Sequence, residues 1–189
     1  MTIKYQIEFL NYWHSGSGLT GSIKADNVVN KTEDNLPYIP GKTLKGLLRD
    51  AAERIHDLDP GIVSQEFINI VFGKRSDDAT KENEGKCFFT NAFLSTQLRR
   101  RVVDNKLTHS LYATLASTRI EADGQAKDHS LRQLEVTIPV VMYASIEYFP
   151  RDEKYQETME LGMKWIKEMG KNRNRGLGKC AFSILKKNG

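Results

Sequence analysis

One stretch of the chain places cationic side chains at the spacing of a helix face. Lys42, Lys45 and Arg49 recur at intervals of three and four residues, so they share one stripe of a helix that follows Pro40. Gly46 interrupts the same helix, where a glycine costs about 1 kcal/mol relative to alanine. A backbone or ligand passing close beside the helix would explain this glycine. The alternative is an amphipathic helix whose charges are only solvated.

A second basic segment lies near the C-terminus. No acidic residue occurs after Lys171, whereas cations continue to the end: Lys171, Arg173, Arg175, Lys179, Lys186 and Lys187. Gly176-Leu-Gly-Lys179 is not a Walker motif, because that pattern requires glycine where Arg173 stands. What remains is a glycine-rich basic loop, which brings backbone N–H groups and arginines to phosphates without reading sequence. With a further cluster at 99–101, this charge pattern predicts a polyanionic partner.

Asp26 is the candidate for metal-assisted chemistry. Its carboxylate could hold Mg²⁺ beside a phosphodiester or take a proton from a 2′-hydroxyl, and a turn or capping role is the alternative. The nearby Gly16–Gly21 segment matches G-x-G-x-x-G, but Pro37 and the residues before it do not form the helix that a dinucleotide site needs. The four histidines are scattered, and no Cys-x-x-Cys pair exists, so a closed zinc site is not expected.

Length and composition indicate one globular domain. The chain has 189 residues, 39% hydrophobic residues, a mean hydropathy of -0.51, a net charge of +4 and a pI near 9.0. No apolar run is long enough to span a membrane, and the N-terminus does not resemble a signal peptide, so we expect a cytoplasmic protein without a membrane partner. Cys87 and Cys180 are expected to be buried free thiols.

Hydrophobic periodicity predicts alternating strands and helices. Strands are expected at 3–13, 86–94, 140–149 and 180–185, and helices at 44–58, 63–72, 97–103 and 153–169. The last long helix would place Trp165 on its inner side and end at Gly170 as a C-cap. Residues 105–138 are expected to form two extended arms around a polar tip. The order strand, helix, strand, strand, helix, strand predicts an α+β fold of the ferredoxin-like type with insertions.

Four segments resemble motifs of the CRISPR-associated RAMP superfamily. Pro37–Arg49 is similar to the signature P-x-I-P-G-[ST]-[ST]-L-K-G-x-[LM]-R, and Gly176–Phe182 resembles the C-terminal glycine-rich loop with its following strand. Phe89–Ser95 is similar to the R-D-A-F-L-S strand, with Asn91 where the family often has aspartate. Thr118–Glu121, with 133–136, resembles the arm of type III backbone subunits. The resemblance covers nearly the whole chain and is closest to group 7, the subunits that polymerise along guide RNA.

The resemblance implies one RAMP domain over 1–189, with an RRM-like core and an inserted thumb at 105–138. It implies guide RNA held by its backbone in a basic groove, and a thumb that interrupts the guide–target duplex and flips out a nucleotide. Implied partners are guide RNA, target RNA, further copies of the chain in a filament, other RAMP subunits, and a nuclease or large polymerase-like subunit. The implied RNA-binding residues are His14, Ser15, Gly16, Lys42, Thr43, Lys45, Gly46, Arg49, Arg119, Arg173, Arg175, Gly176, Leu177, Gly178 and Lys179.

Catalysis is implied only for some members. In type III subunits an aspartate before the proline arm cleaves target RNA with a divalent metal, and Asp26 lies in the corresponding loop. The resemblance therefore implies Asp26 as catalytic residue and ligand of Mg²⁺ or another divalent metal. Other backbone subunits only bind RNA and leave cutting to a separate nuclease, so both functions stay open.

Two rival functions also stay open. One is a stand-alone repeat-RNA processing endonuclease with a metal-independent histidine site, for which His14 is the candidate. The other is a generic RNA-recognition module that stacks bases on aromatic side chains of its sheet. Phe88, Phe89 and Phe93 do not alternate regularly, so most aromatic side chains are expected to pack the core.

Overall fold

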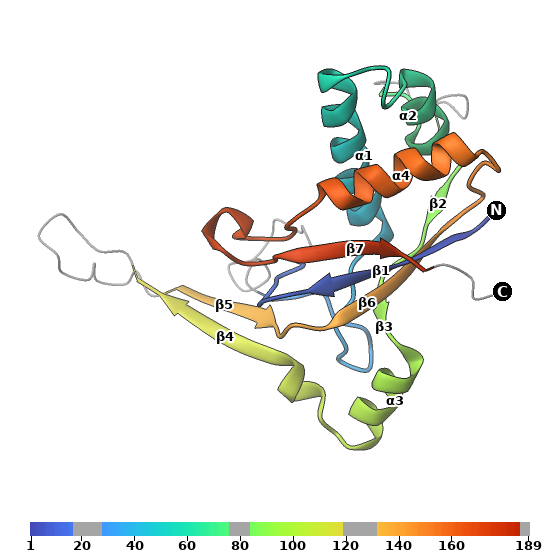
Figure 1. The fold of residues 1–189 in the computed structure, drawn as a ribbon. Coiled ribbons are helices and arrows are strands. Elements are labelled where there is room, and N and C mark those ends of the chain that lie inside the picture. Colours follow the sequence, from blue (N-terminus) through green and yellow to red (C-terminus); the bar gives the residue numbers. More distant parts are fainter. Residues whose placement is uncertain (17–27, 76–83, 119–131, 186–189) are drawn as a thin grey trace, which may run out of the picture.

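The computed structural model describes residues 1–16, 28–75, 84–118 and 132–185 of the chain (Figure 1). The fold is α+β, and its main sheet is antiparallel in every pair of strands. The strands of this sheet are β1 (Ile3–Phe9), β2 (Phe88–Phe89), β3 (Phe93–Leu94), β6 (Val141–Glu147) and β7 (Cys180–Ile184). Their order is β2-β6-β1-β7, and β3 also pairs with β6. The first and last strands of the chain therefore lie side by side.

Four α-helices occur among the described residues, and two of them cover one face of the sheet (Figure 1). They are α1 (Gly41–Leu58), α2 (Gln65–Phe72), α3 (Thr96–Asp104) and α4 (Glu153–Trp165). α1 packs against α4 and β2, while α4 also packs on β7. Ser64, Ser95 and Asp152 accept a hydrogen bond from a backbone N–H in the first turn of α2, α3 and α4, respectively, which explains why these helices begin where they do.

The core lies between the helices and the sheet. β1 alternates regularly, with Ile3, Tyr5, Ile7 and Phe9 buried toward the helices. α1 buries Leu44, Leu48, Ala51, Ala52 and Ile55, whereas Leu47 is half-buried and Leu58 is exposed at the end of the helix. Both cysteines are buried and free, as the sequence predicted. No helix in the part of the chain that the structure describes has the length and apolarity to cross a membrane.

A two-stranded ribbon projects from this body (Figure 1). A 3₁₀ turn at Thr108–Leu111 leads into β4 (Tyr112–Ser117), which pairs with β5 (Arg132–Thr137) in an antiparallel register that sets Leu115 opposite Leu134. The ribbon lies within the segment predicted as a thumb. The polar tip expected at 122–130 lies outside the described residues.

Two strand boundaries differ from the sequence prediction. β1 ends at Phe9 rather than at residue 13, because Trp13 pairs with Thr137 at the base of the ribbon. The strand expected at 86–94 is split into β2 and β3, because Ala92 leaves β6 and exchanges two backbone hydrogen bonds with Ile39, at 2.9 and 3.1 Å.

The predicted end of the last helix is wrong as well. α4 stops at Trp165, and Ile166 adopts an extended conformation that turns its side chain into the core. Trp165, expected on the inner side, is instead 44% exposed. Gly170 has the positive φ of a C-cap glycine (93°), but it lies beyond the helix. Its role is close approach, since a Cβ there would lie 2.3 Å from the carbonyl oxygen of His14.

Candidate nucleic-acid interface

The proline arm fixes the start of α1 against the edge of the sheet. Ile39 is paired with Ala92, and the backbone N–H of Gly41 donates to Asn91 Oδ1 at 2.8 Å. A Cβ on Gly41 would lie 2.0 Å from the carbonyl oxygen of Phe89, so only glycine fits this position. Asn91 thus satisfies an N–H at the start of α1, a role that its amide oxygen fills without a charge.

The predicted cationic stripe lies on one flank of α1. Lys42 and Thr43 are exposed, and Lys45 and Arg49 are half-buried. Arg49 is held by Glu53, with Nε to Oε1 at 2.8 Å, and Arg75 binds the same carboxylate with Nη2 to Oε2 at 2.5 Å. Burial opposes ionisation of Glu53, but these hydrogen bonds outweigh it and lower its pKa. Within the described part of the chain Lys42 and Lys45 have no ion pair, so they are the cations of the stripe that remain available to a ligand.

Gly46 lies on the exposed side of α1, next to this stripe. A Cβ added there would meet no atom within 4 Å. Nothing in the described residues therefore requires glycine at this position. Its helix-propensity cost has no compensation among the residues that the structure describes, so the open backbone surface is available to an external chain.

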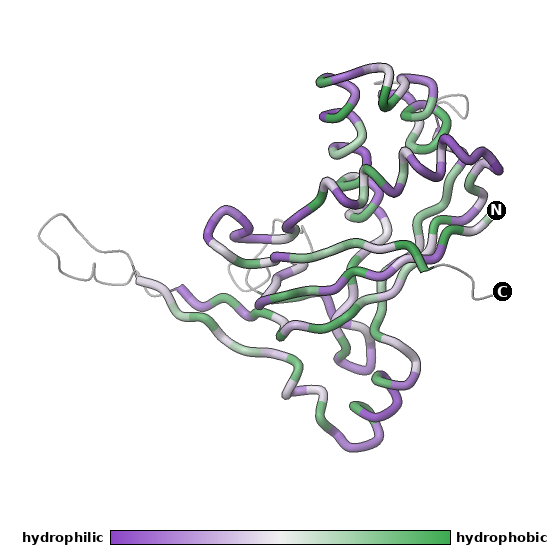
Figure 2. Tube along the Cα trace, in the orientation of Figure 1, coloured by the Kyte–Doolittle hydropathy of each residue, from purple (hydrophilic) through white to green (hydrophobic). Residues whose placement is uncertain are grey.

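The basic loop predicted at 173–178 is tied to the segment that follows β1. The N–H of Gly178 donates to the carbonyl of Tyr12 at 2.8 Å, and that of Lys171 donates to the carbonyl of His14 at 3.0 Å. Asn11 completes the link, because its side chain donates to Gly176 and accepts from the N–H of Lys179. Figure 2 shows that the connection between α4 and β7 is predominantly hydrophilic.

The arginines of this loop lie in a tight turn. A short 3₁₀ turn at Arg173–Arg175 is flanked by two left-handed residues, Asn172 and Gly176, which close the loop tightly. Both arginines are exposed, Leu177 is half-buried and Gly178 is buried. A Cβ on Gly178 would lie 1.9 Å from the carbonyl oxygen of Met169, so this glycine lets two backbone segments pack together.

His14 enters the interface through its backbone rather than its ring. The imidazole is 1% exposed, and its Nδ1 lies 2.7 Å from the carbonyl oxygen of Glu135. Burial lowers the pKa of His14, so the ring is held neutral and donates through Nδ1. Its Nε2 is buried without a partner among the described residues, and a Cβ on Gly16 would lie 2.9 Å from it.

Glu135 joins the base of the ribbon to the segment that precedes the proline arm. Its Oε2 accepts from the N–H of Val29 at 3.2 Å, and its Oε1 binds Lys31 Nζ at 2.7 Å. The Lys31 ammonium also lies 4.0 Å from the centre of the Tyr112 ring on β4. Ser15 pairs with Asn30 through a 2.8 Å backbone hydrogen bond. Residues 14–16, residues 28–31 and the ribbon base therefore form one connected unit.

The structure thus brings most of the predicted contact residues into two neighbouring groups, one on α1 and one around the basic loop. Asp26 and Arg119 lie outside the described residues. Within the described ranges, no group of three or more histidine, cysteine, aspartate or glutamate residues is arranged to hold a metal ion.

Sequence reasoning missed an exposed aromatic cluster on the sheet face opposite the helices. Phe93 pairs with Tyr143 across β3 and β6, and both are more than one third exposed. Phe88 lies on the same face, and the ring of Tyr38 stacks on Phe93 with centroids 6.0 Å apart. In one continuous strand the side chains of Phe88 and Phe93 would point to opposite faces, because side chains alternate. The break between β2 and β3 brings them to the same face, so the sequence pattern did not show the cluster.

Comparison with known proteins agrees with this architecture. The RAMP superfamily model matches residues 6–181, which is most of the chain. The chain therefore belongs to the RAMP superfamily. No curated protein sequence matches it.

Two solved structures share its fold over nearly the whole length. A chain of the Type III-B Cmr-beta complex bound to cognate target RNA superposes with a TM-score of 0.68 at 10% identity, covering 97% of each chain. A chain of the apo state of Type III-B Cmr-beta gives the same TM-score at 11% identity, covering 99% of this chain and 98% of the other. At such low identity these comparisons establish the fold.

Proposed function

We propose that this protein is a guide-RNA-binding backbone subunit, of the group 7 type, in a type III-like CRISPR interference complex. Membership of the RAMP superfamily and the fold shared with chains of Type III-B Cmr-beta support this proposal. We further assign the core to the ferredoxin-like class, supported by the strand order β7-β1-β6-β2 with α1 and α4 on one face.

Gly46 is the observation that carries RNA binding. It is a mid-helix glycine with free space beside it, flanked by two lysines that have no ion pair in the described part of the chain. A sugar–phosphate strand crossing α1 at this point could approach the helix backbone and neutralise Lys42 and Lys45. The exposed arginines of the 173–175 turn extend the positive surface. Such contacts recognise a backbone rather than bases.

The finer parts of the proposal concern assembly and catalysis. As a backbone subunit the protein would pair its guide with target RNA and assemble with further copies of itself, other RAMP subunits and a nuclease or large polymerase-like subunit. Asp26 would cut the target with a divalent metal. Replacing Asp26 by Ala should abolish cutting and leave RNA binding intact, and undiminished cutting would exclude this assignment.

RNA binding is tested directly with the full chain. We expect a labelled single-stranded RNA to bind at low salt, and the Lys42→Gln, Lys45→Gln double variant to bind more weakly. For each phosphate that a lysine no longer neutralises, the slope of log affinity against log salt should fall by about 0.7. Arg151→Gln removes an exposed charge in the turn before α4 and serves as the control. Absence of any nucleic acid after purification, together with no retention on heparin at low ionic strength, would refute the proposal.

A stand-alone processing endonuclease remains the first alternative. Incubation with repeat RNA in EDTA separates it from the leading proposal, because a histidine site would still cut. The burial of the His14 ring argues against that ring as the reacting group.

The second alternative, base stacking on the open face of the sheet, is favoured by a specific observation. Tyr143 on a central strand and Phe93 beside it are exposed on the same face, as this mode of binding requires. If the sheet holds the RNA, Tyr143→Ala should weaken binding by about 5-fold or more, while the lysine double variant changes little. If α1 holds the RNA, the two results are exchanged.

A further inference from the structure

We infer that a pocket between α1 and the end of α4 holds one nucleotide of the bound strand, with its phosphate between Arg54 and Arg173 and its base against Trp165. This inference rests on the proposed RNA-binding function and specifies a contact that neither the sequence pattern nor the family resemblance assigns. Neither Arg54 nor Trp165 belongs to the predicted interface.

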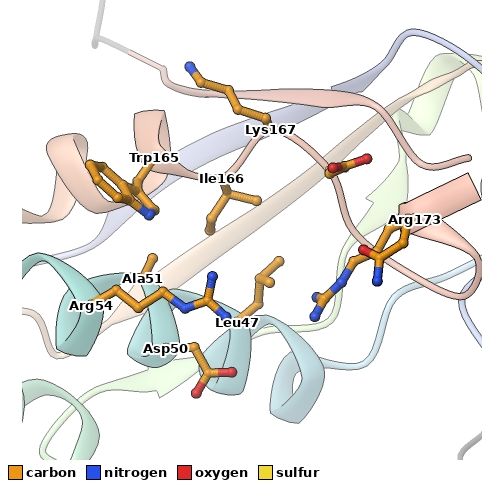
Figure 3. A pocket seen from close by; sticks show the side chains of 10 residues that line it. Leu47, Asp50, Ala51, Arg54, Trp165, Ile166, Lys167 and Arg173 are labelled. Atoms are coloured by element: carbon orange, nitrogen blue, oxygen red, sulfur yellow. The ribbon is translucent and has the colours of Figure 1, made fainter. Parts of the chain in front are cut away.

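The pocket has the size and lining for a nucleotide. Its volume is about 410 Å³, and it is lined by Leu47, Asp50, Ala51, Arg54, Trp165, Ile166, Lys167, Glu168, Arg173 and Asn174. Figure 3 shows Leu47 and Ala51 on its floor, Trp165 beside Arg54 at one end and Arg173 at the other. Six of its ten lining residues are polar or charged, which suits a phosphate, and the apolar side chains of Leu47, Ala51, Trp165 and Ile166 suit a base or sugar.

Two guanidinium groups line this pocket without an ion pair among the described residues. Arg54 and Arg173 extend toward Leu47 from opposite sides in Figure 3, while Lys167 extends away. Neither guanidinium has an ion pair or hydrogen bond within the described residues. Like charges facing each other are unfavourable unless an anion joins them, and planar guanidinium groups suit phosphate oxygens.

The acidic residues of the pocket do not neutralise all of its positive charge. Asp50 is directed toward Arg75, with Oδ1 3.7 Å from Nη2. Glu168 also lines the pocket. Because Lys167 extends away and Asp50 is paired with Arg75, the guanidinium groups of Arg54 and Arg173 exceed the remaining carboxylate by one charge. A phosphodiester carries one negative charge, which matches this excess.

Trp165 provides a flat surface beside the arginines. The chain has two tryptophans, and Trp13 is 1% exposed and stacked on Phe9, whereas Trp165 is 44% exposed. Ile166, the next residue, takes the inward position, and the indole of Trp165 is left outside. An exposed indole next to guanidinium groups suits a stacked nucleobase.

The position of the pocket favours RNA over an acidic protein segment. Leu47, on its floor, directly follows Gly46, so a strand crossing the open helix surface would reach the pocket in its next nucleotides. Arg173 belongs to the basic loop already proposed to contact the same strand. An acidic peptide would satisfy the guanidinium groups but would not need an exposed indole.

The test uses tryptophan fluorescence and RNA binding together on the full chain. A single-stranded RNA of about 16 nucleotides is titrated into wild type, Trp165→Phe, Trp165→Ala, the Arg54→Gln, Arg173→Gln double variant and Arg151→Gln as control. We expect RNA to quench the wild-type indole emission, and Trp165→Phe to lose this quenching but keep its affinity, because phenylalanine still stacks. Trp165→Ala should bind about 5-fold or more weakly, and the double arginine variant should reduce the salt slope by about 0.7.

The outcomes separate this inference from the function on which it rests. The anisotropy of a labelled RNA can show binding while RNA leaves the Trp165 emission unchanged and the double arginine variant keeps the wild-type salt slope. In that case the pocket assignment is wrong and RNA binding elsewhere stands. If no RNA binds to any variant, the proposed function itself fails. If polyglutamate, but not RNA, shields Trp165 from iodide, the pocket is a protein-docking site and the inference is overturned.

Discussion

Replacing Gly46 should make the protein more stable and a poorer RNA binder. Because a Cβ at this position meets no atom within 4 Å, Gly46→Ala introduces no clash and recovers the helix propensity that glycine lacks. The expected gain is about 1 kcal/mol in the free energy of unfolding. For a chain of this length that corresponds to a rise of about 2–4 °C in Tm.

Gly162 provides the matched control. It also lies within a helix, α4, and a Cβ there meets no atom within 4 Å, but it faces the core side rather than the proposed RNA path. Gly162→Ala should therefore stabilise by a similar amount and leave RNA affinity unchanged.

The assay combines urea or thermal unfolding with RNA anisotropy. Gly46→Ala should lower RNA affinity, and Gly46→Gln, which adds a longer side chain across the strand's path, should lower it by about 10-fold or more, or about 1.4 kcal/mol. Destabilisation by Gly46→Ala would show that the position is constrained within the molecule. Unchanged affinity in Gly46→Gln would show that no strand passes there, and α1 would no longer qualify as the RNA surface.

Three further predictions concern the supporting structure. Gly178→Ala should cost at least about 2 kcal/mol in urea unfolding, since φ is positive and a Cβ would clash with Met169, whereas Gly176→Ala, with free space, should cost about 1 kcal/mol. Burial lowers the pKa of His14, so below about pH 6.5 the unfolded chain takes up a proton that the native state does not. The free energy of unfolding should therefore fall with decreasing pH, and it should fall less steeply in His14→Gln. Burial raises the thiol pKa of Cys87 to about 11 and of Cys180 to about 12, so both should react with a disulfide reagent slowly at pH 8 and quickly in urea.

The part of the interface that depends on local pattern was predictable from the sequence. Helix periodicity placed Lys42, Lys45 and Arg49 on one flank of α1, although the helix expected from residue 44 begins at Gly41. The basic loop was recognisable from its composition. These features are set by residues close together in the chain, so they need no knowledge of the fold.

The partners of each residue were not predictable. Arg49 is paired with Glu53, the His14 ring is buried against the ribbon, and Phe93 becomes exposed beside Tyr143 only because the strand is broken at Ala92. The last two of these outcomes depend on contacts between distant segments.

The sequence by itself therefore determined the order of the main strands and helices, the cationic flank of α1 and the distribution of positive charge along the chain. Only the tertiary structure decided that α4 ends at Trp165, that its indole faces outward, and that Arg54 and Arg173 meet over the same pocket. The physical reason is that a side chain's exposure is decided by whichever segment packs best into the core. Here Ile166 fills the inward position, and the equally apolar Trp165 next to it is left on the exposed side.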